Sequence, residues 1–191
     1  MSLLRSGWAA ILLYHAGISV GLAMKPGAFS MVTRGWNWWF GVISVQIGVA
    51  TYFSVYHLLE PLLGVNSEPL SPLPIALADF GLTPHSMIAF AVYFSTIHPV
   101  FEELCWRELV CPDSQKPHVR DLEFAAYHVI VLQLLFPGCW LLTIISVSAL
   151  ITASWIWRFI RHRLKGLAVP VFSHALADCG IILATLSLLH E

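Results

Sequence analysis

Charged residues are scarce in this sequence. Only 11% of its 191 residues are Asp, Glu, Lys or Arg, 58% are hydrophobic, and the mean hydropathy is +0.75. Soluble domains typically carry about 25% charged residues. The net charge of −1 excludes the strongly basic surface typical of nucleic-acid-binding proteins. The composition therefore indicates a protein embedded in a lipid bilayer, with no nucleic-acid partner.

Several common chemical signatures are also missing. The four cysteines show no CxxC pairing, so neither a zinc ribbon nor a disulfide framework is predicted. The lack of HExxH excludes a zincin, and the lack of an N-x-S/T sequon favours a bacterial membrane. The first apolar stretch has no convincing cleavage pattern, so we interpret it as a retained helix rather than a signal peptide. With no repeat or composition break, we expect one membrane domain over residues 1–191.

Long apolar segments dominate what the chain does contain. A helix needs roughly 20 apolar residues to cross a hydrocarbon core of about 30 Å. The sequence therefore predicts an all-α polytopic integral membrane bundle with about six transmembrane helices. The predicted segments are residues 7–24, 36–63, 84–110, 121–136, 138–159 and 166–189.

Basic residues are concentrated in the odd-numbered loops between these segments. Eight of the ten Lys and Arg residues lie there, whereas the opposite side has Arg5 alone and Arg107 lies within a segment. The positive-inside rule then predicts cytoplasmic odd loops and both termini outside the cytoplasm, in a bacterial inner membrane. Tryptophans are expected at the cytoplasmic interface. They are Trp36, Trp38, Trp39, Trp155 and Trp157.

Three polar motifs interrupt the later apolar segments. An ionisable side chain costs on the order of 2.5–3.5 kcal/mol at the bilayer centre, so such residues indicate function by default. The motifs are Glu102-Glu103-x-x-x-Arg107, Phe124-x-x-x-His128 and His174-x-x-x-Asp178.

Helical spacing separates the roles of the two adjacent glutamates. Glu103 and Arg107 are four residues apart and share a helix face, so we expect them to pair. Glu102 lies about 100° around the helix and is expected to have no partner on its own face. Pro99 is expected to kink this segment. The alternative is an ion-pair network with a purely structural role.

The motifs are also predicted to lie at one depth. Glu102, His128 and His174 are each seven to nine residues from a predicted cytoplasmic loop. At 1.5 Å per residue, this places them roughly 10–14 Å below the surface, which favours a single site. We interpret the other histidines as packing or interface residues, with interest in His98 because it lies one turn before Glu102. These histidines are His15, His57, His85, His98, His118, His162 and His190.

The motifs carry a resemblance to a known family. EELCWR matches the pattern EExxxR, FAAYH matches FxxxH, and HALAD matches HxxxN or HxxxD. Together they resemble the CPBP (ABI) family of intramembrane glutamic endopeptidases, which includes the type II CAAX prenyl endopeptidases. The resemblance covers residues 84–190 approximately.

The resemblance implies a glutamate-dependent peptidase. Glu102 is implied to be the general base that activates water, and His128 is implied to hold or polarise that water. Glu103 and Arg107 are implied to support the site. The resemblance thus implies a hydrolase, a protease that works inside the membrane.

The resemblance also assigns roles in the last helix. His174 and Asp178 are implied to face the scissile carbonyl and to stabilise the oxyanion. The family often has Asn where this chain has Asp178. An ionised aspartate cannot donate to an oxyanion, whereas a protonated one can, or it can orient His174 instead.

The sequence leaves more than one cofactor, substrate and functional class open. A metal-free mechanism is expected, the alternative being a zinc ion held by Glu102, His128, His174 and Asp178. The expected substrate is a membrane protein or peptide, either lipidated or carrying a C-terminal sorting signal. The alternatives are a protease that processes sorting signals or peptide precursors, a non-catalytic membrane chaperone or immunity protein, and a transporter with a proton relay.

Overall fold

The described residues form a bundle of helices without a strand. The computed structural model describes residues 6–63, 72–110 and 114–189. Arg5, Cys111 and residues 65–71 of the second predicted loop lie outside the described residues. The all-α prediction is confirmed. The helices are α1 (Gly7–Ala23), a 3₁₀-helix (Ala28–Met31), α2 (Trp38–Leu63), α3 (Pro72–Asp79), α4 (Pro84–Thr96), α5 (His98–Leu104), a π-helix (Cys105–Leu109), α6 (Val119–Leu135), α7 (Trp140–Leu164) and α8 (Ala168–Leu189).

One helix boundary and one additional helix differ from the sequence prediction. The fifth segment continues to Leu164, so Arg158, Arg161 and Arg163 lie in α7 and not in a loop. Basic side chains in a last turn face the negative end of the helix dipole, which favours this extension. The short helix α3 was not predicted.

The third apolar segment is divided at the residues that carry the first motif. Helix α4 ends at Thr96, and α5 begins at His98 with Pro99 in its first turn. Proline removes a backbone donor and clashes with the preceding turn, so the predicted kink is confirmed. After Leu104 the helix widens into the π-helix, which ends with the Val110 amide donating to the Cys105 carbonyl at 3.0 Å.

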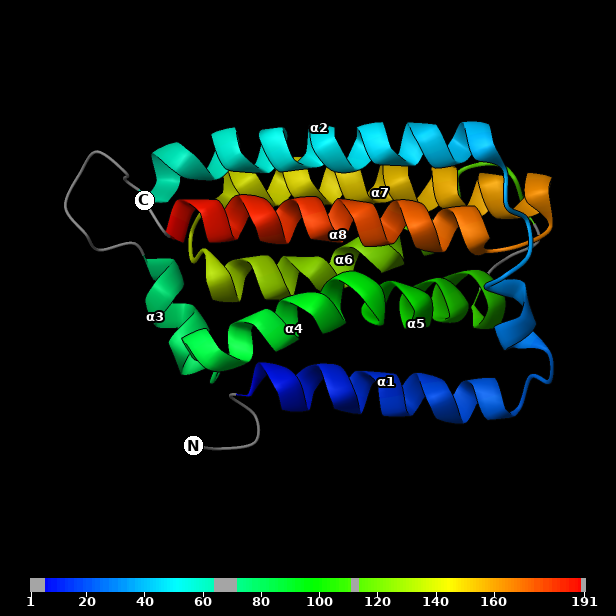
Figure 1. Ribbon diagram of the computed structural model, residues 1–191, viewed down its shortest axis with the longest axis horizontal. Coiled ribbons are helices and arrows are strands. Elements are labelled where there is room, and N and C mark those ends of the chain that lie inside the picture. The colour runs from blue at the N-terminus through cyan, green and yellow to red at the C-terminus, as the bar shows by residue number, and fades with distance from the viewer. Residues whose placement is uncertain (1–5, 64–71, 111–113, 190–191) are drawn as a thin grey trace.

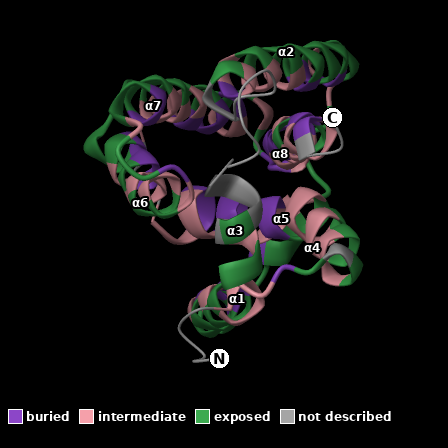
Figure 2. Cartoon of the chain, turned by 90° about the vertical axis from the view of Figure 1, so that its left-hand side faces the viewer, coloured by how far each residue is buried: buried purple, intermediate pink, exposed green. Residues whose placement is uncertain are grey.

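The helices pack in layers from α1 to α2. Figures 1 and 2 show α1 along one edge, α4, α5 and α6 in the middle, and α2, α7 and α8 on the far side. Buried residues gather around α5 and the facing side of α8 (Figure 2). Helices α2 and α8 approach closely at two glycines, since a Cβ on Gly180 would lie 2.5 Å from the carbonyl oxygen of Gly48.

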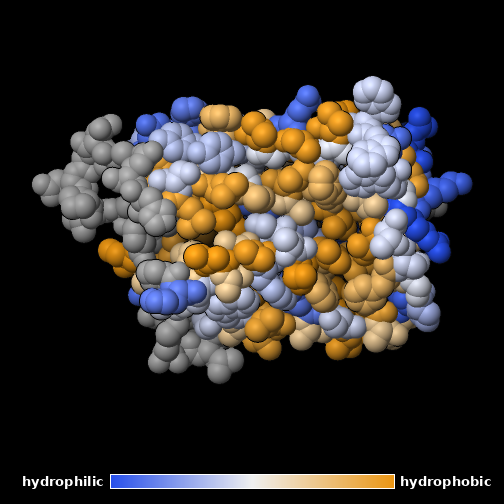
Figure 3. Space-filling model, in the orientation of Figure 1, coloured by the Kyte–Doolittle hydropathy of each residue, from blue (hydrophilic) through white to orange (hydrophobic). Residues whose placement is uncertain are grey.

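The outer surface is apolar. Helices α2, α7 and α8 are long and apolar enough to cross a membrane, and α1 is a shorter apolar helix. Large hydrophobic side chains are exposed on these helices, as with Leu141 of α7, which is 73% exposed. Hydrophobic residues cover much of the face drawn in Figure 3. The protein is thus an integral membrane protein.

The tryptophans predicted for the aromatic belt differ in their exposure. Trp36, Trp38 and Trp39 are exposed at one end of the bundle, as an interfacial position requires. Trp157 is only 5% exposed, so its predicted place at the interface is wrong.

The basic loops lie together at one end of the bundle, on the right in Figure 1. The amides of Leu167 and Ala168 donate to the carbonyls of Met31 and Arg34 at 2.8 and 2.9 Å. Arg158 donates to the Lys116 carbonyl at 2.7 Å. The first loop is therefore tied to the fifth, and the third loop is tied to the C-terminal part of α7, as expected if these segments lie on one side of a membrane.

Candidate active site

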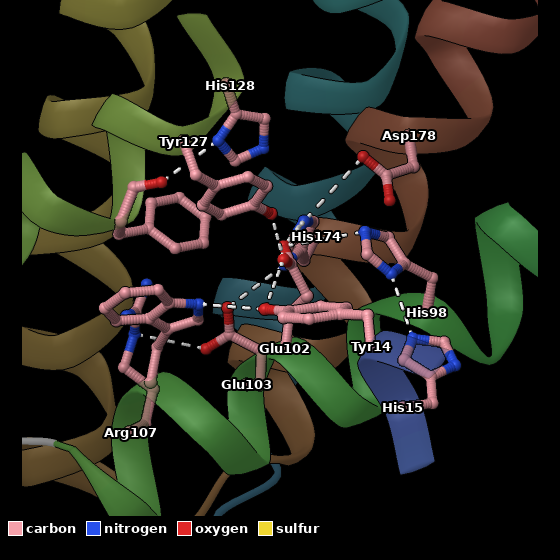
Figure 4. A network of polar contacts seen from close by, with 12 residues as sticks. Tyr14, His15, His98, Glu102, Glu103, Arg107, Tyr127, His128, His174 and Asp178 are labelled. Atoms are coloured by element: carbon pink, nitrogen blue, oxygen red, sulfur yellow. Dashed lines mark hydrogen bonds and ion pairs between the residues drawn. The ribbon is translucent and has the colours of Figure 1, made fainter. Parts of the chain in front are cut away.

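Glu102 lies at the centre of the polar residues inside the bundle (Figure 4). Its side chain is completely buried. Oε1 accepts hydrogen bonds from the Tyr14 hydroxyl, at 3.1 Å, and from the Tyr127 hydroxyl. Trp106 donates from Nε1 to the Tyr14 oxygen at 3.3 Å, which orients this phenol toward the carboxylate. A tyrosine of α1 and a tyrosine of α6 thus both donate to the same oxygen of Glu102.

The second oxygen of Glu102 has different neighbours. Oε2 is 3.7 Å from Nε2 of His98 and 3.7 Å from Nε2 of His174. Within the described residues it has no direct hydrogen-bond partner. Because His98 is four residues before Glu102, the prediction that Glu102 has no partner on its own helix face is wrong. The carboxylate instead presents one oxygen to two imidazoles.

Glu103 joins the first motif to the third. Its Oε2 is 3.3 Å from Nε of Arg107, which confirms the predicted pair. Its Oε1 is 3.0 Å from Nδ1 of His174. A carboxylate only accepts, so Nδ1–H of His174 donates to it and directs Nε2 toward Glu102.

An aromatic layer fixes the ring of His174. Trp157 stacks on it with ring centroids 4.3 Å apart and planes at 16°. The fully buried Phe124 packs edge-on, 6.2 Å from the same ring. The guanidinium of Arg107 lies 5.1 Å from the Phe124 ring centroid, within cation–π range. Phe124 in the second motif therefore supports groups of the other two motifs.

His128 does not hydrogen bond to any other predicted site residue within the described part of the chain. Its Nδ1–H donates to the Phe124 carbonyl at 3.0 Å, and its ring packs 4.0 Å from the Tyr127 ring centroid. The neutral ring therefore keeps Nε2 as an acceptor. Tyr127, its neighbour in sequence, makes the direct contact with Glu102.

Asp178 lies on the far side of His174 from Glu103. Its Oδ1 is 3.7 Å from Nε2 of His174, and its side chain is buried. The predicted shared face of His174 and Asp178 is thus present. Three carboxylates surround one imidazole, and each comes from a predicted motif.

The fit of a metal ion can be tested on the donor set. In the part of the chain that the structure describes, no group of three or more His, Cys, Asp or Glu side chains is placed to hold one. The residues present do not assemble the zinc site considered from the sequence.

Sequence reasoning noted His98, one turn before Glu102, but gave it no role in the site, and it missed the other residues that reach Glu102. His98 matched the spacing of a helical pair with Glu102, but an isolated histidine in an apolar segment resembles a packing residue. Tyr14 and Tyr127 reach Glu102 through the tertiary fold, and no local pattern marks them. His15 was also interpreted as packing, yet it hydrogen bonds to His98 at 3.1 Å.

This geometry suits acid–base chemistry on water. One buried carboxylate has an oxygen without a direct partner among the described residues, and an oriented imidazole faces it. A carboxylate and an imidazole at such a distance can act on one water and one carbonyl group.

Comparison with known proteins agrees with the motifs. The model of the Rce1-like type II CAAX prenyl endopeptidases matches residues 84–180, which include all three motifs. No curated protein and no solved structure matches the chain. The match spans half of the chain and leaves α1, α2 and α3 outside it. The chain therefore belongs to the family of Rce1-like type II CAAX prenyl endopeptidases.

Proposed function

We propose that the protein is an intramembrane endopeptidase that hydrolyses a peptide bond of a membrane-associated protein or peptide near the cytoplasmic face. Family membership supports a protease that works in the membrane. The observation that carries the proposal is the pair formed by Glu102 Oε2 and His174 Nε2, 3.7 Å apart in a buried polar centre. The basic loops gather at one end of the bundle, and the positive-inside rule supports cleavage on the cytoplasmic side of the membrane.

Glu102 acts as the general base. Its Oε1 already accepts from two phenols, so Oε2 is the oxygen that takes the proton of the hydrolytic water. The water oxygen then bonds to the scissile carbonyl carbon, and the carbonyl π electrons move to its oxygen. When the C–N bond breaks, the proton on Glu102 passes to the leaving amine.

His174 stabilises the oxyanion by donating from Nε2. Its Nδ1–H is already donated to Glu103, so this role requires the imidazolium form. Carboxylates of Glu102, Glu103 and Asp178 surround the ring and balance its charge. Arg107 in turn balances Glu103.

His128 remains a proposed member of the site. Its Nδ1–H is held by the Phe124 carbonyl, so neutral Nε2 can only accept a hydrogen bond. Nε2 of His128 would accept a hydrogen bond from the hydrolytic water, as the sequence resemblance implies. Tyr127 is the more direct partner of Glu102.

The proposed mechanism uses the side chains alone, with no metal. Incubation of the purified protein with EDTA and with phenanthroline should leave its rate unchanged. Loss of activity that added zinc restores would contradict this part of the proposal.

The enzymatic test uses the full chain in proteoliposomes and an internally quenched peptide that ends in a farnesylated CAAX motif. Glu102→Gln and His174→Ala should each lower kcat by at least about 10²–10³-fold, since each removes an acid–base or oxyanion group. Glu123→Gln is a matched control, because Glu123 is a surface residue of α6 paired with Arg120. Full activity of Glu102→Gln would contradict the mechanism.

The substrate is tested with a second peptide. A peptide with a C-terminal sorting signal and no farnesyl group replaces the CAAX peptide under the same conditions. Cleavage of the CAAX peptide alone favours prenylated substrates. Cleavage of the sorting-signal peptide alone favours signal processing, and in both cases Glu102 should be required.

A further inference from the structure

A second row of polar groups leads to Glu102 from the side opposite Glu103. The Tyr93 hydroxyl is 2.7 Å from Nδ1 of His15, and Nε2 of His15 is 3.1 Å from Nδ1 of His98. Nε2 of His98 is 3.7 Å from Oε2 of Glu102. Figure 4 shows His15, His98 and Glu102 in this order. We call Tyr93, His15 and His98 the histidine relay.

The hydrogen bonds of the relay share one direction. A neutral imidazole has one N–H, so only one of the two nitrogens between His15 and His98 carries a proton. Because an ionised Glu102 only accepts, the tautomer that presents a donor to it carries Nε2–H on His98. His98 Nδ1 then accepts from His15 Nε2–H, and His15 Nδ1 accepts from the hydroxyl of Tyr93. In this arrangement the Tyr93 hydroxyl is the donor at the outer end of the row.

Packing keeps the relay in place. His15 and His98 are buried, at 4% and 7% exposure. The His15 ring stacks on Phe101 with centroids 4.4 Å apart, and the His98 ring stacks on Phe94 at 4.6 Å. With both rings stacked, the choice between tautomers depends on the hydrogen bonds along the row.

We propose that His15 and His98 are positioning residues that direct an N–H toward Oε2 of Glu102, the oxygen that takes the proton from water. The proposal rests on the proposed role of Glu102. The 3.7 Å distance fits a free enzyme, in which catalytic hydrogen bonds are often longer than in the substrate complex.

The relay gives α1 a part in the reaction. Helix α1 lies outside the matched residues 84–180. Its consecutive residues Tyr14 and His15 nevertheless act on the two different oxygens of Glu102. Tyr14 donates to Oε1 directly, whereas His15 acts on Oε2 through His98. One turn of α1 therefore completes a site whose other groups come from the matched region.

A double-mutant cycle with the farnesylated CAAX peptide tests the relay. His15→Phe keeps a flat stacking ring and removes both nitrogens, so it should lower kcat about tenfold with KM within about twofold. His98→Gln lowers kcat by itself but provides an amide N–H that needs no neighbour to fix it. In the His98→Gln background, His15→Phe should therefore cost less than about twofold.

Two outcomes would overturn the relay. Equal losses from His15→Phe in both backgrounds would assign His15 to packing, and no loss in the wild-type background would remove its role altogether. His57→Phe, at an exposed histidine of α2, is the control and should change nothing. If Glu102→Gln is also active, the proposed function itself fails, and this outcome is separate from failure of the relay alone.

A spectroscopic test needs no substrate. In the full chain labelled with ¹⁵N-histidine, the ring nitrogens of His98 should show a neutral Nε2–H tautomer by NMR. His15→Phe and Tyr93→Phe should both convert His98 to a mixture of tautomers, whereas His57→Phe should not. An Nδ1–H tautomer of wild-type His98, or a spectrum that neither variant changes, would contradict the proposal.

Discussion

The two oxygens of Glu102 have different surroundings. Phenols from α1 and α6 donate to Oε1, whereas Oε2 faces two imidazoles at 3.7 Å. Two donors on one oxygen hold the carboxylate in a single orientation. We infer that this division separates the anchoring of Glu102 from its chemistry.

Removal of one phenolic hydroxyl should loosen this anchor. Tyr127→Phe keeps the ring that packs on His128 and removes one of the two donors to Oε1. We expect kcat to fall by about tenfold, the equivalent of one hydrogen bond to a charged group, with little change in KM. Steady-state kinetics on the CAAX peptide measures this effect.

The control for Tyr127→Phe is Tyr52→Phe. The Tyr52 hydroxyl lies 3.3 Å from Ser187 Oγ, at the α2–α8 contact and away from Glu102. Its loss should leave kcat within about twofold. A Tyr127→Phe variant as active as Tyr52→Phe would show that Oε1 needs no second donor.

Residue spacing predicted some of these contacts and missed others. Glu103 and Arg107 pair because four residues separate them on one helix, and this was visible in the sequence. The contact of Glu103 with His174 and that of Tyr14 with Glu102 join distant segments, so no local pattern contains them. Trp157 resembled an interfacial tryptophan because it lies near basic residues, but helix rotation turns it onto His174.

At the scale of elements, Glu102 and Glu103 lie on a short helix between two irregularities. Helix α5 begins after the break at Ile97 and is followed directly by the π-helix Cys105–Leu109. A π-helix often marks a functional site because it changes the direction of its side chains. Pro99 made the break predictable, whereas the π-helix has no marker in the sequence.

The α2–α8 contact should control the position of the third motif. A Cβ on Gly180 would meet the Gly48 carbonyl oxygen at 2.5 Å, so Gly180→Ala must push the helices apart. Overpacking of this kind costs about 1–3 kcal/mol. We expect a lower thermal midpoint and reduced kcat, because Asp178 lies only two residues before Gly180. Thermal unfolding in detergent and kinetics on the CAAX peptide measure both effects.

Gly17→Ala, in α1, is the matched control for Gly180→Ala. A Cβ on Gly17 has no atom within 4 Å among the described residues, so the same change should be tolerated. Equal losses of stability in the two variants would show that the close approach of α2 and α8 is not the reason why Gly180→Ala destabilises the protein.

At the scale of the whole molecule, hydrophilic residues are distributed unevenly along the bundle. Hydrophilic residues gather at the end formed by the odd-numbered loops, and the sides of the bundle are apolar (Figure 3). Hydropathy predicted this distribution because it depends on composition along the chain. The arrangement of helices around Glu102 depends on tertiary packing, which the sequence pattern does not specify.

The charge distribution predicts a membrane topology. Alkaline phosphatase, which is active only outside the cytoplasm, should be active when fused at the C-terminus. A fusion in the loop at Lys165 should be inactive, and green fluorescent protein at that position should fluoresce. The reverse pattern would place the basic end outside and would contradict the proposed cytoplasmic site of cleavage.

The most direct test of intramembrane proteolysis compares the termini of membrane proteins in cells with wild-type protein and in cells with Glu102→Ala. Both proteins must be present in the membrane at equal levels, as immunoblots can show. We predict a new N- or C-terminus that occurs only with the wild-type protein, and that terminus would identify the substrate. Identical termini in the two strains, with Glu102→Ala still complementing a deletion, would contradict the proposed protease and favour a binding role.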